Sequence, residues 1–264
     1  MTQPLFLKLG GSLITDKTGV EAERKDILVR LAQEIASARS LNPDLQLVLG
    51  HGSGSFGHVA GAKFGTRQGV KSVAEWQGFV RVSDAAARLN RLVVERLLDA
   101  GVPAASLQPS ASAICEDGRI TCLAHEPLQR ALASGLVPVV YGDVAFDLVR
   151  GGTIISTEEV LMFLAGSLSP SWFLLAAETP GVLDDDGQVV PLITAENFEQ
   201  IAPAIGGSRG TDVPGGMASK VLSMLDFVQT YPTSHVRVFS GLESENLLQM
   251  LVNPDRPVGT EIRL

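Results

Sequence analysis

Three glycine-rich segments, each with a lysine or a histidine inside it, hold the residues best suited to chemistry on phosphate groups. They are Lys8–Lys17 (KLGGSLITDK), His51–His58 (HGSGSFGH) and Asp212–Lys220 (DVPGGMASK). Glycine has no Cβ, so its backbone N–H group can approach an anion closely. Lysine and histidine add positive charge, and the combination predicts that these segments bind phosphate.

The first segment follows an apolar run, Leu5–Leu9, that is typical of a strand buried on both faces. The run leads directly into Gly10, Gly11 and Ser12, and ligands of open α/β sheets bind beyond the carboxyl ends of such strands. Lys8 stands near the end of this strand, where a buried lysine needs an anionic partner. A lysine at the sheet edge, beside an ordinary glycine turn, is the alternative interpretation.

The second segment follows another strand-like run, Leu45–Leu49, and carries a G-x-G-x-x-G pattern at Gly52, Gly54 and Gly57. As a dinucleotide fingerprint, this pattern requires an acidic residue at the tip of the next strand, about 20 residues on. The residues found there, 74–78, have a helical pattern, so a dinucleotide-dependent oxidoreductase is the least favoured function. We expect instead a second glycine turn that faces the first, with both of the segment's histidines converging on an anion.

The third segment places Gly215 and Gly216 before a helix whose apolar stripe begins at Val221. A helix N-terminus attracts anions through its unpaired N–H groups and its dipole. Lys220, in the first turns of that helix, could reach a phosphate, although the same residues also fit an ordinary loop-to-helix junction. The sequence G-x-x-x-x-G-K-[ST] does not occur in the chain, so any ATP must be bound without a P-loop.

The elements that must position these segments alternate between strands and helices. Strand-like runs occupy Leu5–Leu9, Leu45–Leu49, Val137–Tyr141, Trp172–Ala177 and Val236–Ser240, and amphipathic stripes occupy 27–38, 76–97 and 221–228. This alternation predicts an α/β fold, a three-layer αβα sandwich around a mostly parallel sheet. Within it, Asp143–Ser156 predicts a hairpin around Gly151 and Gly152, and the cluster at Gly166–Ser171 predicts a boundary between two lobes.

Composition excludes several function classes. The 264 residues include 21 Lys+Arg and 29 Asp+Glu, a net charge of −8 that makes a general nucleic-acid binder a poor candidate. No apolar run approaches the roughly 18 residues of a membrane span, and we expect no signal peptide. Only two cysteines occur, Cys115 and Cys122, so a reducing compartment, the cytoplasm, is expected.

In this order, the three segments resemble the isopentenyl phosphate kinases of the amino acid kinase superfamily. Tyr141–Asp143, directly after a strand, also fits, and the closing His58 is the most specific feature because most superfamily kinases for carboxylate or carbamate acceptors lack it. The resemblance implies phosphorylation of isopentenyl phosphate to isopentenyl diphosphate in isoprenoid biosynthesis, with ATP and Mg²⁺. It also implies direct in-line transfer without a general base.

The family's architecture is an αβα sandwich with both substrates bound by one chain. The resemblance therefore implies an acceptor-phosphate-binding lobe over residues 1–168 and an ATP-binding lobe over residues 169–264. One continuous sheet would join the lobes in a single structural domain, usually as a homodimer. The expected partner is a small isoprenoid monophosphate, with neither nucleic acid nor membrane involved.

Residue roles carry over from the family onto matching positions. Lys8 would bridge the transferring phosphoryl group, Lys17 and His58 would bind the acceptor phosphate, and Lys220 would lie on the ATP side; these four form the catalytic set. Glu158 would be the carboxylate that organises the lysines. The substrate-binding set is Gly10, Gly11, Ser12, Gly52, Ser53, Gly54, Gly57, His58, Trp76, Phe79, Val80, Val82, Gly142 and Asp143. The ATP-binding set is Lys8, Gly10, Glu178, Gly181, Gly215, Gly216 and Lys220.

Three positions depart from the family's usual pattern. Ser53 stands where the family has a third glycine, which argues against a glycine-only backbone angle there. Glu158 and Glu159 stand where it has two aspartates, and Ala177–Gly181 replaces Thr-Asp-Val-Asp-Gly. Two alternatives therefore stay open: a fosfomycin-type phosphonate kinase of the same superfamily, and a non-catalytic nucleotide-sensing module.

Overall fold

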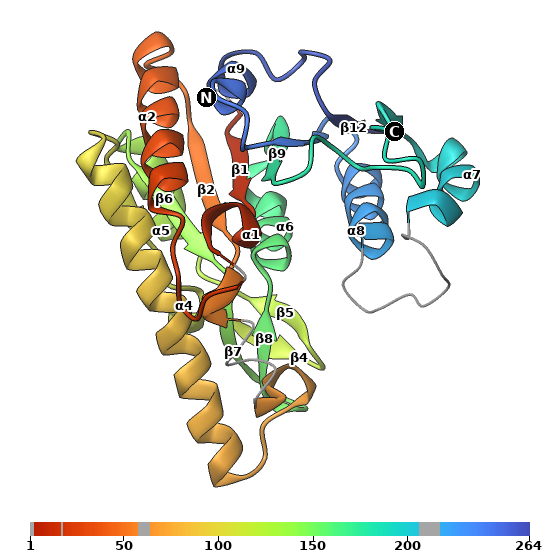
Figure 1. The fold of residues 1–264 in the computed structure, drawn as a ribbon. Coiled ribbons are helices and arrows are strands. Elements are labelled where there is room, and N and C mark those ends of the chain that lie inside the picture. The colour runs from red at the N-terminus through yellow and green to blue at the C-terminus, as the bar shows by residue number, and fades with distance from the viewer. Residues whose placement is uncertain (1–2, 17, 58–63, 206–216) are drawn as a thin grey trace.

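A large, mostly parallel sheet forms the centre of the molecule (Figure 1). The computed structural model describes residues 3–16, 18–57, 64–205 and 217–264. Within these ranges, eight strands form the sheet in the order β10-β12-β11-β9-β1-β2-β6-β3. Their bounds are β1 Leu5–Leu9, β2 Leu47–His51, β3 Ala104–Ser106, β6 Val137–Tyr141, β9 Trp172–Ala177, β10 Leu192–Ile193, β11 His235–Ser240 and β12 Thr260–Ile262. Neighbouring strands run parallel except β11 and β12.

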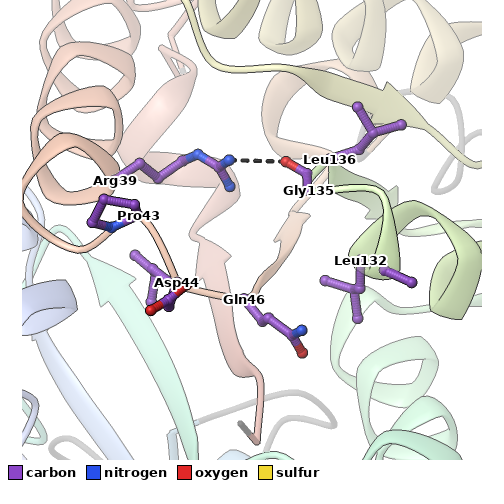
Figure 2. Close-up of a pocket in the computed structure, with 9 residues that line it drawn as sticks. Arg39, Pro43, Asp44, Gln46, Leu132, Gly135 and Leu136 are labelled. Carbon is purple, nitrogen blue, oxygen red and sulfur yellow. Dashed lines mark hydrogen bonds between the residues drawn. The ribbon is translucent and has the colours of Figure 1, made fainter. Parts of the chain in front are cut away.

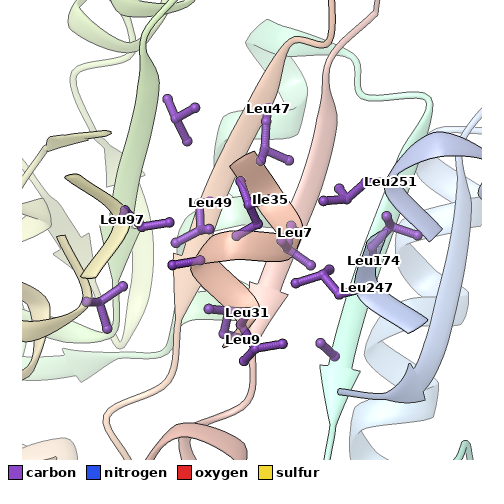
Figure 3. Packing of buried hydrophobic residues seen from close by; sticks show 14 of the residues in the cluster. Leu7, Leu9, Leu31, Ile35, Leu47, Leu49, Leu97, Leu174, Leu247 and Leu251 are labelled. Atoms are coloured by element: carbon purple, nitrogen blue, oxygen red, sulfur yellow. The ribbon is translucent and has the colours of Figure 1, made fainter. Parts of the chain in front are cut away.

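Helices cover both faces of this sheet. The helices are α1 Gly11–Ile14, α2 Lys25–Leu41, α4 Val73–Asp99, α5 Glu126–Ala133, α6 Thr157–Leu168, α7 Ala195–Ile205, α8 Met217–Thr230 and α9 Asn246–Val252, with 3-10 turns η1 Thr66–Gln68 and η2 Pro109–Ala111. Side chains of α2, α4 and α9 pack on one face (Figure 3), and side chains of α5, α6 and α8 pack on the other. The predicted three-layer αβα sandwich is therefore confirmed.

The first strand shows why the sequence adopts this arrangement. Alternate residues of a strand point to opposite faces. In β1, Leu5, Leu7 and Leu9 enter the core beside α2, whereas Phe6 enters the core beside α6. By the same alternation Lys8 lies on the face of Phe6, and this places its side chain on the side of the sheet that α6 covers.

A smaller sheet extends from the main one and contains the predicted hairpin. Its strands, all within the described residues, are β4 Ile114–Glu116, β5 Arg119–Cys122, β7 Asp143–Asp147 and β8 Gly151–Ile155, in the order β5-β4-β7-β8. The hairpin prediction is confirmed, but its turn occupies residues 148–150 and not the two glycines.

The turn lies there because of Asp147 and a neighbouring segment. The Asp147 carboxylate accepts hydrogen bonds from the backbone N–H groups of Val149 (2.9 Å) and Arg150 (2.7 Å), which closes the turn early. Gly151 begins β8 with φ +81°, and a Cβ there would collide with the carbonyl oxygen of Val70. Glycine at position 151 therefore allows the backbone of Val70 to lie close to β8, and it is not part of the turn.

The chain passes between the two expected lobes without interrupting the main sheet. Helix α6 ends at Leu168, β9 begins at Trp172, and β1 pairs with both β2 and β9. Within the described ranges, every helix is too short or too polar to cross a lipid bilayer.

Candidate active site

The first two glycine-rich segments face each other at the carboxyl ends of adjacent strands. Leu9, the last residue of β1, pairs with His51, the last residue of β2. A Cβ added to Gly11 would lie 2.5 Å from the backbone nitrogen of Gly54, and one added to Gly52 would lie 2.7 Å from the backbone nitrogen of Gly11. The two loops therefore pack backbone against backbone, and only residues without side chains permit this approach.

Within the second loop, one position requires glycine for its backbone angle. Gly54 has φ +47°, in the left-handed region that disfavours residues with a Cβ. Ser53 stays outside that region, in agreement with the sequence argument. The serine at this position is compatible with the loop.

A buried threonine that the sequence analysis did not select joins the two loops. The Thr15 hydroxyl donates to the carbonyl oxygen of Gly11 at 2.7 Å and accepts from the backbone N–H of Ser55 at 2.9 Å. Its side chain is fully buried. The sequence signals this role of Thr15 only through its position four residues after Gly11, at the end of α1. The other partner, Ser55, lies 40 residues away and gives no local signal.

Lys8 and Glu158 form an ion pair between the end of β1 and the first turn of α6. Both side chains are largely buried. Burial alone would raise the pKa of Glu158, but the charge and hydrogen bond of Lys8, with a smaller contribution from Lys220, hold this pKa below its ordinary value. Glu158 is therefore anionic, and both lysines act on it electrostatically.

The neighbouring Glu159 has a different task. Its carboxylate accepts from the backbone N–H of Ser156 at 2.6 Å, while the Ser156 hydroxyl accepts from the backbone N–H of Glu159 at 3.2 Å, a capping box. Glu159 also pairs with Arg67 at 2.7 Å. Of the two adjacent glutamates, Glu159 begins the helix and Glu158 faces the lysine.

A cavity of about 940 Å³ lies at the carboxyl ends of β1, β2 and β9. It brings together fourteen of the residues selected from the sequence: Lys8, Gly10, Gly11, Ser12, Gly52, Ser53, Gly54, Gly57, Val82, Gly142, Asp143, Glu158, Glu178 and Lys220. Apolar side chains form two walls, one made by Val82, Ala86, Ile154 and Ile155, the other by Val182, Met224, Val238 and Ile262. The cavity can thus hold two ligands that share a polar centre.

Three residues of the selected helical stripe do not line this cavity. Trp76 and Phe79 pack against Phe146 at tilted ring angles, with ring centroids 5.9 and 5.3 Å from it, and belong to the small hydrophobic cluster beside the hairpin. Val80 is 59% exposed and faces solvent. Since a helix turns by about 100° per residue, the cavity-facing positions of α4 are Val82 and, one turn later, Ala86.

Gly181, expected to bind ATP, is also absent from the cavity lining. It is buried, and a Cβ there would lie 2.7 Å from the hydroxyl of Thr260. Its neighbours Thr179 and Val182 line the cavity in its place. Lys17, His58, Gly215 and Gly216 lie outside the described residues.

The expectation that His51 binds an anion is wrong. Its ring is buried against Tyr141, and it is not part of the cavity wall. Nδ1 lies 3.1 Å from the carbonyl oxygen of Gly52, and Nε2 lies 3.1 Å from the side-chain nitrogen of Asn90. Burial lowers the pKa of His51 to about 4, although the hydrogen bond to Gly52 opposes the shift. A neutral His51 that donates from Nδ1 and accepts at Nε2 satisfies both contacts.

Asp143 lines the cavity at the start of β7, and its carboxylate is held by three donors. The Ser83 hydroxyl and the backbone N–H of Val144 donate to Oδ1 at 3.0 and 2.8 Å, and the backbone N–H of Ser110 donates to Oδ2 at 3.2 Å. Since Ser83 belongs to α4, this carboxylate fixes the helix that provides Val82 and Ala86 to the cavity.

The two glutamates that line the cavity are both paired with cationic side chains. Among the described residues, no three His, Cys, Asp or Glu side chains gather closely enough to bind a metal ion. Glu158 is occupied by Lys8, and Glu178 is paired with Arg24 at 2.8 Å. Magnesium bound mainly through substrate phosphates and water fits this arrangement, because Mg²⁺ commonly keeps several waters and needs few protein ligands.

A second cavity, of about 320 Å³, lies at the opposite end of β2 (Figure 2). Arg39 donates to the carbonyl oxygen of Gly135 across it at 2.9 Å, and Asp44, Gln46 and Leu132 line it. It contains none of the residues selected from the sequence. The chemistry therefore belongs to the larger cavity.

Comparison with known proteins agrees with this geometry. The amino acid kinase family model matches residues 3–240. An isopentenyl phosphate kinase from Methanocaldococcus jannaschii is 33% identical over 265 residues, 97% of each chain. An isopentenyl phosphate kinase from Haloferax volcanii is 40% identical over 222 residues, 84% of this chain and 87% of the relative.

Solved structures give the same result. A crystal structure of an isopentenyl phosphate kinase aligns with a TM-score of 0.82 at 26% identity, covering 98% of this chain and 99% of that chain. The facing glycine loops and the lysine–glutamate pair fit the family that the sequence relatives indicate. The chain belongs to the amino acid kinase family and, within it, to the isopentenyl phosphate kinases.

Proposed function

We propose that the protein transfers the terminal phosphoryl group of ATP to isopentenyl phosphate and forms isopentenyl diphosphate for isoprenoid biosynthesis. The observation that carries this proposal is the larger cavity, where Lys8 and Lys220 both act on Glu158 beside two facing glycine loops. The named activity of the relatives at 33% and 40% identity supports the choice of acceptor.

The chemistry requires alignment and charge stabilisation more than proton transfer. An alkyl phosphate has a second pKa near 6, so the attacking oxygen is already anionic at pH 7 and needs no general base. The difficulty is to bring two polyanions together in line. Lys8, held by Glu158 beside Gly10 and Gly11, is placed to stabilise the charge that moves during transfer.

The two apolar walls suggest how the ligands divide the cavity. We place the hydrocarbon tail of the acceptor against Val82, Ala86 and Ile154, in the acceptor lobe of residues 1–168. The nucleotide occupies the other wall, with Met224 and Val238, in the ATP lobe of residues 169–264. The phosphates meet at the glycine loops between the walls.

The remaining roles rest on the family resemblance. Lys17 and His58 bind the acceptor phosphate, and Gly215, Gly216 and Lys220 contact the ATP phosphates, which carry Mg²⁺. We also propose a homodimer in the cytoplasm. If His58 donates to the acceptor phosphate, His58→Ala lowers kcat by about one to several orders of magnitude, and an unchanged kcat would contradict that role.

A coupled ADP-release assay tests the function. With MgATP, ADP release should depend on isopentenyl phosphate or dimethylallyl phosphate and be near background with fosfomycin or without acceptor. Release with fosfomycin alone would retain the kinase and overturn the acceptor. Absence of release with every acceptor, together with ATP binding by calorimetry, would favour the nucleotide-sensing module.

A further inference from the structure

The segment from Thr15 to Arg24, between the first glycine loop and α2, is tied to both sides of the larger cavity by ion pairs. On the acceptor side, Arg88 of α4 donates to Glu21 from Nε at 3.0 Å, and Arg96 of α4 pairs with Glu23 at 2.9 Å. The same helix provides Val82 and Ala86 to the cavity wall. The segment and the acceptor wall are therefore held as one unit.

On the nucleotide side, the segment is tied by the ion pair of Arg24 with Glu178. The Arg24 guanidinium lies 2.8 Å from the carboxylate of Glu178, the residue that follows β9 and lines the cavity. The two side chains are 32% and 27% exposed, so the pair is partly shielded from water. It joins residues from the two lobes across 154 positions of the sequence.

The charge of Glu178 gives this pair a function. A carboxylate in the wall of a cavity that receives nucleotide phosphates repels them unless a cation neutralises it. Arg24 supplies that cation from the acceptor side and also fixes the direction of the carboxylate. The position of Glu178 therefore depends on the segment that contains Arg24.

Hydrogen bonds join the two ends of this segment to each other. Thr15 and Glu23 form an antiparallel bridge, and the backbone N–H of Asp16 donates to the carbonyl oxygen of Ala22 at 2.9 Å. The backbone N–H of Ala22 also donates to the Ser55 hydroxyl at 3.3 Å, which links the segment to the second glycine loop. The second glycine loop is therefore connected through Ala22 to the end of the segment that contains Arg24.

From these contacts we propose that Arg24 is a positioning residue that couples the two substrate sites, so that bound acceptor phosphate strengthens nucleotide binding through the Arg24–Glu178 pair. This inference rests on the proposed function, since it assumes an acceptor phosphate at the glycine loops. The coupling is reciprocal, because each ligand changes the affinity for the other by the same factor.

The experiment measures the dissociation constant of a non-hydrolysable ATP analogue with Mg²⁺ by calorimetry, with and without saturating isopentenyl phosphate. In the wild type, the acceptor should tighten binding about three- to tenfold, the range expected for a partly shielded ion pair. Arg24→Ala, Glu178→Ala and the double variant should all bring the ratio near one, and Arg24→Lys should restore part of it.

The control is Lys25→Ala, which removes an exposed positive charge next to Arg24 and leaves the Arg24–Glu178 pair in place. It should leave the ratio of the two dissociation constants as in the wild type. A merely structural role for Arg24 would lower the melting temperature and leave this ratio intact, which would overturn the proposal, as would a wild-type ratio of one. ADP release by the wild type tests the proposed function separately; where another acceptor supports release, the ratio is measured with that acceptor.

Discussion

The Lys8 amine and the Glu158 carboxylate meet in an ion pair although 150 positions separate them in the sequence. Lys8 comes from the end of β1, and Glu158 comes from the start of α6, on the face of the sheet that this helix covers. Each element thereby fixes the charged group of the other. The pair stands beside both glycine loops, at the polar centre of the cavity.

Replacing Glu158 by glutamine should slow the reaction. The amide keeps the size of the side chain but removes the charge that holds Lys8 and attracts Lys220, so kcat should fall about 10- to 100-fold. The control is Glu159→Gln, which can keep the capping box but removes the charge that pairs with Arg67, and it should lower the free energy of unfolding by less than about 1 kcal/mol with little change in kcat. Steady-state kinetics and denaturation of both variants check this. A slower Glu159 variant and a normal Glu158 variant would reverse the assignment.

Removing the Lys8 amine should be more damaging. Lys8→Ala should lower kcat by about 1000-fold and change the KM for ATP little, because this charge acts mainly when charge moves in the transition state. Lys25→Ala, an exposed lysine at the start of α2, serves as the control.

A double variant separates two causes of the Lys8 effect. In Lys8→Ala, the unpaired Glu158 would also repel phosphate, so Lys8→Ala/Glu158→Gln should recover part of the loss in ATP affinity but not in kcat. Steady-state and ATP-binding measurements give both quantities. A mild kcat effect in both variants would exclude a transition-state role for Lys8.

The Thr15 hydroxyl should matter for activity although Thr15 does not line the cavity. Thr15→Val keeps the shape but removes the hydrogen bond to Gly11 and the one from Ser55 of the second loop, which should cost about 1–3 kcal/mol of stability and lower kcat/KM about tenfold. Thr15→Ser, which retains the hydroxyl, should restore most of the activity. Thr18→Val, which removes an exposed hydrogen bond to Asp16 from the same segment, is the control. Equal effects at positions 15 and 18 would show that the joined loops are not the cause.

Stability should decline as the pH falls from about 6.5 toward 4. Burial holds His51 neutral in the folded protein, with its pKa lowered from 6.5 to about 4. In this window the unfolded chain binds a proton that the folded chain does not, so the free energy of unfolding falls by as much as about 3 kcal/mol. The lowered pKa of Asp147 affects stability mainly at still lower pH, below its ordinary value of 3.8.

Urea denaturation between pH 7.5 and 5 checks this prediction. The variant His51→Gln cannot titrate and should give a flatter pH dependence, although it is less stable throughout. An identical slope in both proteins would assign the acid sensitivity to other groups.

The sequence predicts strands well where both flanks are apolar, and less well where a glycine continues a strand. The bounds of β1, β6 and β9 match the predicted runs, but β2 continues through Gly50 to His51. Gly50 remains in the strand because it pairs with Lys8 and Val140, and Leu161 of α6 fills the space above it. These partners are distant in the sequence, so local propensity could not reveal them.

The candidate site likewise contains some features with a local sequence signal and others that depend on residues distant in the sequence. Glycine pairs after strands could be predicted because strand ends and glycine have strong local signals. The partner of Thr15, the Arg24–Glu178 pair and the inward turn of His51 depend on contacts across 39 to 154 positions and required the structure. Likewise, apolar spacing located α4 but could not show that Val82 lies on its cavity side and Val80 on its solvent side.

The close approach of Gly11 and Gly54 also restricts how this enzyme can diversify. A side chain introduced at Gly11 or Gly54 displaces the other loop, so a substitution in one loop requires a compensating change in the other. Few single substitutions are therefore tolerated at these positions. The apolar wall of Val82, Ala86 and Ile154 is formed by side chains and not by closely packed glycine backbone. A directed-evolution library aimed at new acceptors should therefore randomise that wall and leave the glycines fixed, since new tails can be selected there without rebuilding the phosphate centre.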